Sequence, residues 1–397
     1  MKVIIDLRKY DGVVGGVERG ALEIAINATK RGHDILLVCK ASRESEVREL
    51  LADLGPGRLA IVPVHVRSHA ISLANARLDC GFLQDLAERE GADLIHFFYN
   101  WAFPCRKKVP CLLTIHDVIP FTFREAMGWF QNHFLYRTAI RTACRLNDLV
   151  VTVSEFSRQD IAQKAGVPLS KIRVIPNGLR DPAKQNEQVW LGLADRFGLQ
   201  KGYVLNVGGI HERKNIPRLI RAFSKLAEER SYEGRLVITG SVSGAPYQEK
   251  MKKQCDAAVA EAEIEDRVVF TGFISDRDLD ILLRNADVFV YPSLYEGFGI
   301  PILEAMKVGT PVVTSNVTAM PEVAGDAGLL VDPTNVRDMA RQIGRMLNDI
   351  ALCKNLVAKG HERSADYSWS KNCEQYLAIY EELAGERGGP RGCRHRV

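Results

Sequence analysis

Thirteen short apolar runs, separated by stretches with helical periodicity, constrain the fold of this chain more than any other feature. The runs are rich in Val, Ile and Leu and lack strict alternation, which is typical of parallel strands buried on both faces. Helices between such strands predict right-handed crossovers and doubly wound sheets. The predicted strands lie within residues 2–7, 34–39, 59–64, 93–98, 111–117, 149–154 and 172–178, and then 203–209, 235–241, 267–273, 287–293, 310–316 and 328–333.

The strands fall into two groups, which predicts two Rossmann-like α/β domains in tandem. A length of 397 residues is more than one ordinary core holds. The polar stretch 176–188 contains two prolines and has no periodicity, so it predicts a linker. We therefore expect domains at 1–185 and 186–366, a last helix at 367–385, and a flexible Gly/Arg-rich tail at 386–397.

Composition excludes several classes of protein. Hydrophobic residues make up 46% and charged residues 26%, as in soluble globular proteins. No apolar stretch reaches the ~20 residues of a membrane span, and the first residues do not read as a signal peptide. The nine cysteines form no C-x-x-C pair and no zinc spacing, which favours a reducing cytoplasm and predicts neither a metal site nor a cofactor.

The charge is unevenly distributed. Residues 1–185 carry 26 Lys and Arg against 20 Asp and Glu. Residues 186–397 carry 27 Lys and Arg against 29 Asp and Glu. The first half is therefore the part expected to face an anionic surface or substrate. We expect no nucleic-acid partner.

Two acids flank a glycine-rich turn in the segment YEGFGIPILE, residues 295–304. The segment follows an apolar run and reads as the end of a strand, a turn and the start of a helix. Such a helix N-terminus can hold phosphate, while the carboxylate of Glu304 within it can accept hydrogen bonds from sugar hydroxyls. The alternative is that Glu304 only complements the helix dipole and that Glu296 is a solvated loop acid.

A second glycine turn, in residues 206–223, places two cations at a predicted helix N-terminus, with Asn215 as the expected N-cap. Arg213 and Lys214 would each oppose the helix dipole by about 0.3–1 kcal/mol. A bound anion would reverse that cost, so the pair predicts a diphosphate clamp. The alternative is two solvated surface charges.

Two further features follow predicted strands in the first half. The pair Gly15-Gly16 precedes an amphipathic helix, but G-x-G-x-x-G is absent, which argues against a dinucleotide oxidoreductase. His116 falls at the carboxyl end of a strand, where active-site residues collect. The alternatives are a tight turn at the glycines and a structural histidine.

These features together resemble the family 4 glycosyltransferases, which are retaining enzymes of the GT-B fold. Glu296 and Glu304 match the E-x7-E pattern of that family. The resemblance covers nearly the whole chain and implies two Rossmann-like, doubly wound domains facing across a cleft. The first domain would bind the acceptor and the second the nucleotide-sugar donor. The matching segments include TIHDVIPFTF, VTVSEFSRQDI, VIPNG, RKNIPRLIRAF and EGFGIPILEAMKVGTPVVTSN.

The resemblance implies a role for each matched residue of the second domain. Glu304 would bind the ribose hydroxyls of the donor, and Glu296 the hydroxyls of the transferred sugar. Arg213 and Lys214 would hold the diphosphate. Backbone groups would contact the sugar and phosphates at Phe298, Gly299 and Ile300.

In the first domain, the resemblance implies that Gly15 and Gly16 approach the phosphates and that His116 lies near the reacting sugar. The expected catalytic residues are therefore His116, Glu296, Arg213 and Lys214. Many members have Arg where this chain has Gly209, so the diphosphate would depend more on Arg213 and Lys214. Residues 367–384 resemble the family's last helix, which crosses back to the first domain.

The sequences of these motifs are most similar to those of bacterial mannosyltransferases of surface-polysaccharide assembly. This resemblance implies GDP-mannose as donor and a glycan or lipid-linked acceptor. A UDP-sugar donor remains an alternative. The same fold would also suit a nucleotide-sugar epimerase, a phosphorylase or a non-catalytic nucleotide-sugar-binding subunit, and these three functions stay open.

The segment 123–148 predicts a helix with a basic stripe. Arg137, Arg141 and Arg145 recur every four residues, and each is worth about 1 kcal/mol near an anionic membrane. This predicts a cytoplasmic protein that binds the inner face of the plasma membrane. The alternative is a helix with a buried aromatic face and a solvated basic face. The aromatic residues near its start are Trp129, Phe130, Phe134 and Tyr136.

Overall fold

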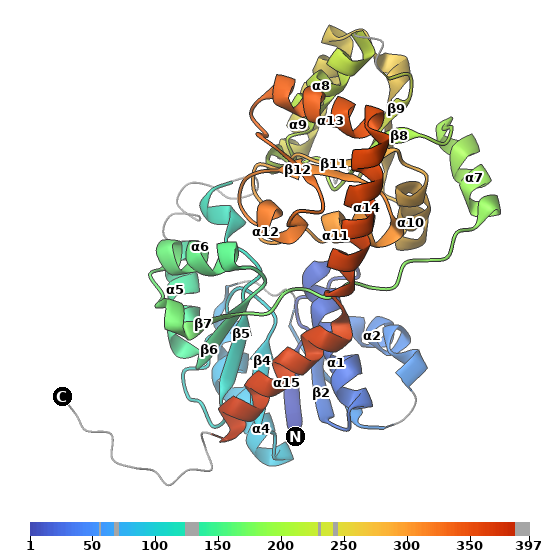
Figure 1. The fold of residues 1–397 in the computed structure, drawn as a ribbon. Helices are drawn as coiled ribbons and strands as arrows, with labels where there is room; N and C mark the ends of the chain where they lie inside the picture. The colour runs from blue at the N-terminus through green and yellow to red at the C-terminus, as the bar shows by residue number, and fades with distance from the viewer. Residues whose placement is uncertain (55–56, 67–70, 124–134, 229–231, 241–244, 386–397) are drawn as a thin grey trace. The chain divides into compact units, whose positions relative to one another are not determined.

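The computed structural model describes residues 1–54, 57–66, 71–123, 135–228, 232–240 and 245–385. The chain divides into two units. Unit 1 comprises the described residues of Met1–Val118, Phe130–Gly178 and Ser368–Val397, and unit 2 those of Ile119–Trp129 and Leu179–Tyr367. Each unit is built around its own parallel sheet (Figure 1).

The sheet of unit 1 has seven strands in the order β3-β2-β1-β4-β5-β6-β7, all parallel to their neighbours. Every predicted run of the first half coincides with one of them, with β2 extending one residue past the predicted end, because both faces of each central strand are buried as the apolar runs require. The strands are β1 (Lys2–Asp6), β2 (Asp34–Lys40), β3 (Leu59–Val64), β4 (Leu94–Phe97), β5 (Cys111–Thr114), β6 (Leu149–Thr152) and β7 (Ile172–Val174).

The sheet of unit 2 has six parallel strands in the order β10-β9-β8-β11-β12-β13. Each coincides with a predicted run of the second half. Its strands are β8 (Tyr203–Val207), β9 (Arg235–Thr239), β10 (Val268–Gly272), β11 (Val288–Tyr291), β12 (Val312–Ser315) and β13 (Leu329–Val331).

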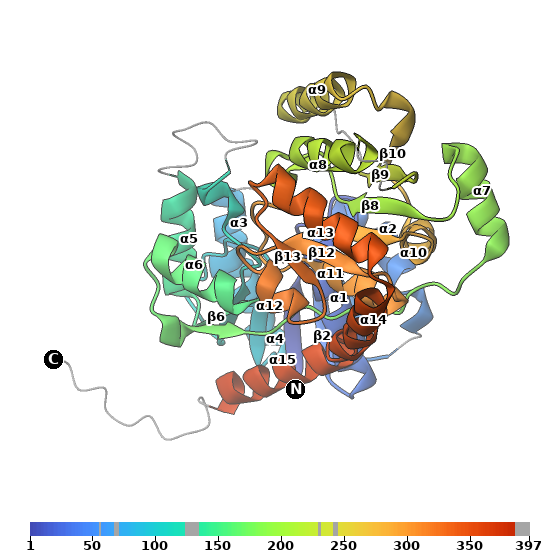
Figure 2. The same cartoon turned by 45° about the horizontal axis from the view of Figure 1, so that its top comes forward.

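Helices cover both faces of the sheets, so the predicted doubly wound α/β class is confirmed (Figure 2). In unit 2, α8 packs with α9 and α13, while α11 packs with α10 and α14. Unit 1 holds α1 (Gly16–Lys30), α2 (Glu44–Leu50), α3 (Leu73–Arg77), α4 (Leu83–Glu90), α5 (Arg137–Leu146), α6 (Glu155–Ala165) and α15 (Trp369–Gly385). Unit 2 holds α7 (Glu187–Phe197), α8 (Ile216–Glu228), α9 (Pro246–Glu261), α10 (Asp276–Arg284), α11 (Ile300–Val308), α12 (Met320–Ala324), α13 (Val336–Asn348) and α14 (Ile350–Ala365).

Helix α15, the last described element, packs against α1 in unit 1. A buried hydrogen-bond chain ties it to the sheet: His96 Nδ1 lies 2.6 Å from the Tyr380 hydroxyl, and His96 Nε2 lies 2.7 Å from Thr114 Oγ1. Burial, and then the proximity of His116, hold the pKa of His96 well below its usual value, so this imidazole is neutral and each ring nitrogen has a hydroxyl partner.

Helix α5 coincides with the end of the helix predicted at 123–148, whereas Trp129, Phe130 and Phe134 lie outside the described residues, as does the predicted tail 386–397. Arg141 and Arg145 are exposed on α5. Within the part of the chain that the structure describes, no helix combines the length and apolarity needed to cross a bilayer.

Candidate functional site

Each sheet has one place where its strand order reverses. In unit 2 it lies between β8 and β11, and in unit 1 between β1 and β4. The loops that leave two such neighbouring strands run to opposite faces of the sheet and open a crevice at the carboxyl ends, where open α/β sheets bind ligands. In unit 2 these loops are residues 208–215 and 292–299, which include the three charged residues predicted there, Arg213, Lys214 and Glu296, as well as Phe298 and Gly299.

The structure brings these three side chains together. Oε1 of Glu296 lies 2.6 Å from Nη1 of Arg213 and 2.8 Å from Nζ of Lys214. Lys214 also donates to the hydroxyl of Tyr291, at 2.5 Å, and its ammonium lies 4.4 Å from the centre of that ring. The side chains of Arg213, Lys214 and Glu296 are only 17%, 8% and 11% exposed. The interpretations as solvated surface charges and as a solvated loop acid are therefore wrong.

The electrostatics of this cluster favour an anion. Burial alone would raise the pKa of Glu296, but the charges of Lys214 and Arg213 hold it below its usual value, so the carboxylate is ionised at neutral pH. These three side chains alone sum to +1 in a mostly desolvated place. A phosphate group would be well matched to a cluster in which cations outnumber the carboxylate.

Glycine and asparagine shape the loop that carries the two cations. Gly208 has φ +134°, and a Cβ there would lie 2.9 Å from Cε of Lys214, so a side chain would displace the lysine. The expected N-cap role of Asn215 is wrong, because its φ is +62° and its Oδ1 accepts from Nη1 of Arg218 at 2.9 Å. Its amide nitrogen donates to the carbonyls of Pro292 and Pro333, at 3.1 and 2.6 Å. Asn215 therefore ties the loop after β8 to the loop after β11.

The predicted turn and helix at residues 295–304 are confirmed. Gly299 has φ +110° and immediately precedes α11, in whose first turn Pro301 lies. The ring of Phe298 packs edge-on against Tyr367, with centroids 5.9 Å apart. Glu304 lies one turn into α11, where Oε1 is 3.6 Å from Nε of Arg180. The first turn of α11 is thus held at the same sheet edge as the cation cluster.

In unit 1, an acid of the chain itself occupies the N-terminus of α1. Oε2 of Glu18 accepts the N–H of Gly15 at 3.0 Å, and a Cβ on Gly15 would lie 2.9 Å from the same oxygen. Nζ of Lys9 lies 3.7 Å from the other oxygen of Glu18. A phosphate that approached Gly15 and Gly16 would therefore meet Glu18 first, with Lys9 as the nearby cation.

His116 follows β5 at the carboxyl edge of unit 1. Burial, together with the positive charge of Lys9, lowers its pKa to about 3, so the imidazole is neutral at physiological pH. Within the described residues its Nε2 is buried and has no hydrogen-bond partner. A neutral histidine with one unused ring nitrogen suits hydrogen bonding to a ligand better than proton transfer near neutral pH.

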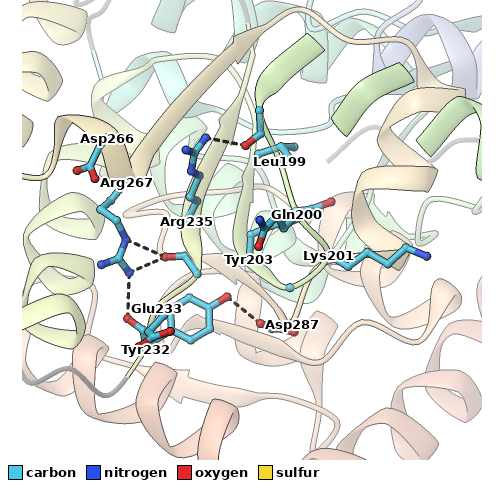
Figure 3. Close-up of a pocket in the computed structure, with 13 residues that line it drawn as sticks. Leu199, Gln200, Lys201, Tyr203, Tyr232, Glu233, Arg235, Asp266, Arg267 and Asp287 are labelled. Carbon is cyan, nitrogen blue, oxygen red and sulfur yellow. Dashed lines mark hydrogen bonds between the residues drawn. The ribbon is translucent and has the colours of Figure 1, made fainter. Parts of the chain in front are cut away.

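A cavity of about 600 Å³ lies at the opposite end of the unit 2 sheet (Figure 3). It is lined by the residues that precede or begin β8 to β11. Several of its polar groups are already engaged: Tyr232 donates to Asp287 at 2.7 Å, and Arg267 donates to the carbonyls of Tyr232 and Gly234. Because ligand sites of parallel sheets lie at the carboxyl ends, this cavity is not the candidate site.

Sequence reasoning missed four residues of these clusters, one of which is Glu18 at the N-terminus of α1. Tyr291 is the last residue of β11, and its place in an apolar run did not mark its hydroxyl as part of a site. Arg180 lies in the predicted linker, and Lys9 follows β1 without belonging to any motif. Contacts of Gly15, Gly16 and His116 with the unit 2 residues stay a prediction.

Two family models match the chain. The model described as glycosyl transferases group 1 matches residues 195–363, and the model of glycosyltransferase family 4 matches residues 14–181. The first match includes the cation cluster and Glu304, and the second includes Gly15, Gly16 and His116.

Similar proteins agree with these matches. The chain is 32% identical over 302 residues to the O-antigen chain mannosyltransferase B of Escherichia coli, over 76% of this chain and 77% of that protein. It is 28% identical over 352 residues to the serotype-specific mannosyltransferase WbdA of Escherichia coli, but it spans only 42% of that protein. The structure of sucrose-phosphate synthase from Thermosynechococcus elongatus matches with a TM-score of 0.77 and 20% identity, over 97% of this chain and 99% of that one. The GT-B fold class is thereby confirmed.

Proposed function

This chain belongs to the family 4 glycosyltransferases, and from that premise we propose that it moves mannose from GDP-mannose to a glycan or lipid-linked acceptor, with retention of the anomeric configuration. The observation that carries the proposal is the cluster of Arg213, Lys214 and Glu296 at the β8–β11 edge. Its net positive charge is suited to the diphosphate of a nucleotide sugar.

The residues present can support the chemistry of transfer. Breaking the bond between sugar and diphosphate develops negative charge on the leaving group, which Arg213 and Lys214 would stabilise together with the N-terminus of α11. Glu296 would accept hydrogen bonds from hydroxyls of the sugar. Neutral His116 would bind a further sugar hydroxyl, and a phosphate oxygen would take the proton of the acceptor, so no protein side chain needs to act as general base.

Two relatives support mannose as the transferred sugar. Both the O-antigen chain mannosyltransferase B and WbdA of Escherichia coli are mannosyltransferases, at 32% and 28% identity. The name of the first also supports an acceptor in bacterial surface-polysaccharide synthesis. We therefore place the protein in the cytoplasm, at the inner face of the plasma membrane, where the basic stripe of α5 would meet anionic lipid.

A donor screen tests the proposal. The protein would be titrated with GDP-mannose, UDP-glucose and UDP-N-acetylglucosamine while its thermal midpoint is followed, because a ligand that binds only the folded state raises that midpoint. GDP-mannose should give the largest rise, and mass spectrometry with a mannose-terminated lipid acceptor should show addition of one hexose. A rise with UDP-sugars alone would reject mannose, and no rise with any donor would reject the whole proposal.

A further inference from the structure

Arg180, near the start of the second segment of unit 2, pairs with three acidic side chains. Its guanidinium forms a two-pronged pair with Asp280 on α10, with Nη1 to Oδ2 at 2.5 Å and Nη2 to Oδ1 at 2.6 Å. Its remaining nitrogen, Nε, lies 3.6 Å from Oε1 of Glu304 on α11 and 3.8 Å from Oδ2 of Asp276 on α10. The side chains of Arg180, Asp280 and Glu304 are 15%, 2% and 18% exposed, so water screens the pairs only weakly.

The segment around Arg180 is fixed as firmly as its side chain. Nζ of Lys307 donates to the carbonyl of Arg180 at 2.9 Å, and the N–H of Ala183 donates to Oδ2 of Asp280 at 2.7 Å. The two hydrogen bonds to Asp280, rather than the anchored backbone, keep the guanidinium in one orientation. Lysine cannot reproduce this arrangement, because an ammonium lacks the planar fork that engages Asp280 while leaving an edge for Glu304.

The charge around Arg180 differs from that of the cation cluster formed by Arg213, Lys214 and Glu296. Arg180 contributes one positive charge against the carboxylates of Asp280, Glu304 and the more exposed Asp276, so the sum is −2. Such a place repels phosphate but leaves carboxylate oxygens of Glu304 able to accept hydrogen bonds from neutral hydroxyls. The two clusters of unit 2 are therefore matched to different parts of one donor, the diphosphate and the ribose.

We propose that Arg180 is a positioning residue for the donor nucleotide, which orients the carboxylate of Glu304 toward the ribose hydroxyls without touching the donor itself. The proposal rests on the proposed function, because it takes Glu304 as a donor-binding residue. It predicts that Arg180 contributes to binding affinity only when the ligand carries ribose hydroxyls.

Calorimetric titration with GDP and with 2′,3′-dideoxy-GDP tests this dependence. Arg180→Lys should bind GDP about tenfold more weakly than the wild type, while the two proteins should bind dideoxy-GDP equally. Asp280→Asn, which loosens the guanidinium without removing it, should show a smaller loss for GDP and none for dideoxy-GDP. Adding Arg180→Lys to Glu304→Gln should cause no further loss.

Lys307→Met is the matched control, because it releases the same segment without altering the Arg180–Glu304 pair. It should leave GDP affinity within about twofold of wild type. An equal loss in Lys307→Met, an equal loss for both nucleotides in Arg180→Lys, or unchanged GDP binding in Arg180→Lys would overturn the inference. If Glu304→Gln weakens GDP binding but Arg180→Lys does not, only this inference fails. If the wild type binds neither GDP nor UDP, the proposed function fails with it.

Discussion

Replacing Glu296 by Gln should tighten the binding of a nucleoside diphosphate while slowing sugar transfer. Gln has nearly the same shape, but it removes the negative charge that now lies 2.6 Å from Arg213 and 2.8 Å from Lys214. The net charge of the cluster rises from +1 to +2. GDP, which lacks the sugar that Glu296 would bind, should therefore meet a more favourable field in the variant.

The size of the gain follows from Coulomb's law. A carboxylate and a phosphate charge ~6 Å apart repel by about 3 kcal/mol at an effective dielectric constant of about 20. Relaxation and water should reduce this to about 1.5 kcal/mol, which corresponds to roughly tenfold tighter binding of GDP. Transfer should fall by roughly 10- to 100-fold, because charge-assisted hydrogen bonds to sugar hydroxyls are worth about 1.5–3 kcal/mol.

The same substitution should change the dependence of stability on pH. The pKa of Glu296 is below its usual value in the folded state, so its ionised form stabilises the fold above the unfolded pKa of 4.5. That contribution is lost as pH falls through the folded pKa. Urea unfolding below about pH 4.5 should therefore show a smaller pH dependence in Glu296→Gln than in the wild type.

Calorimetry with GDP at neutral pH measures the main effect. Glu212→Gln is the matched control, because Glu212 is exposed on the same turn and its substitution changes the net charge of the protein equally. Weaker GDP binding by Glu296→Gln would refute the reasoning. An equal gain in Glu212→Gln would also refute it, since the effect would then come from overall charge.

Three other substitutions test separate features. His116→Asn should lower the rate of transfer without removing any step from its pH profile between pH 5 and 8, because the pKa of His116 is about 3; loss of such a step would contradict a neutral imidazole. Gly178→Ala should cost about 1–3 kcal/mol in urea unfolding, because a Cβ there would lie 2.5 Å from the backbone N of Trp369; unchanged stability would contradict this packing. Arg141→Glu combined with Arg145→Glu should abolish salt-sensitive binding to vesicles that contain anionic lipid, measured by sedimentation; binding that ignores both reversals would exclude the basic stripe as the docking surface.

The strands could be predicted from the sequence because each one is specified by the residues within it and directly beside it. A run such as 287–293 is apolar on both faces, which only a buried strand or helix requires, and flanking glycines and prolines limit its length. The turn and helix at 295–304 were predictable for the same reason, since Gly299 and Pro301 specify the local backbone.

The side-chain partners could not be predicted, because they depend on contacts between distant segments. Lys214 is buried by Tyr291 and Glu296, which lie about 80 positions further along the chain. The residues next to Lys214 in the sequence do not predict these contacts. Asn215 resembles an N-cap in sequence, but its oxygen accepts from the Arg218 side chain and its amide nitrogen donates to two distant carbonyls. Arg180 lies in a polar stretch that predicts a solvated linker, yet Asp280 holds it in place.

The central claim is that the cluster around Lys214 binds the diphosphate of the donor. Calorimetric titration of GDP-mannose into the wild type and into Lys214→Met, with folding of both proteins checked by circular dichroism, tests it most directly. The account predicts binding by the wild type and at least tenfold weaker binding by the variant, since a charge-assisted contact worth about 1.5–3 kcal/mol is lost. Equal affinity of the two folded proteins for GDP-mannose would contradict it.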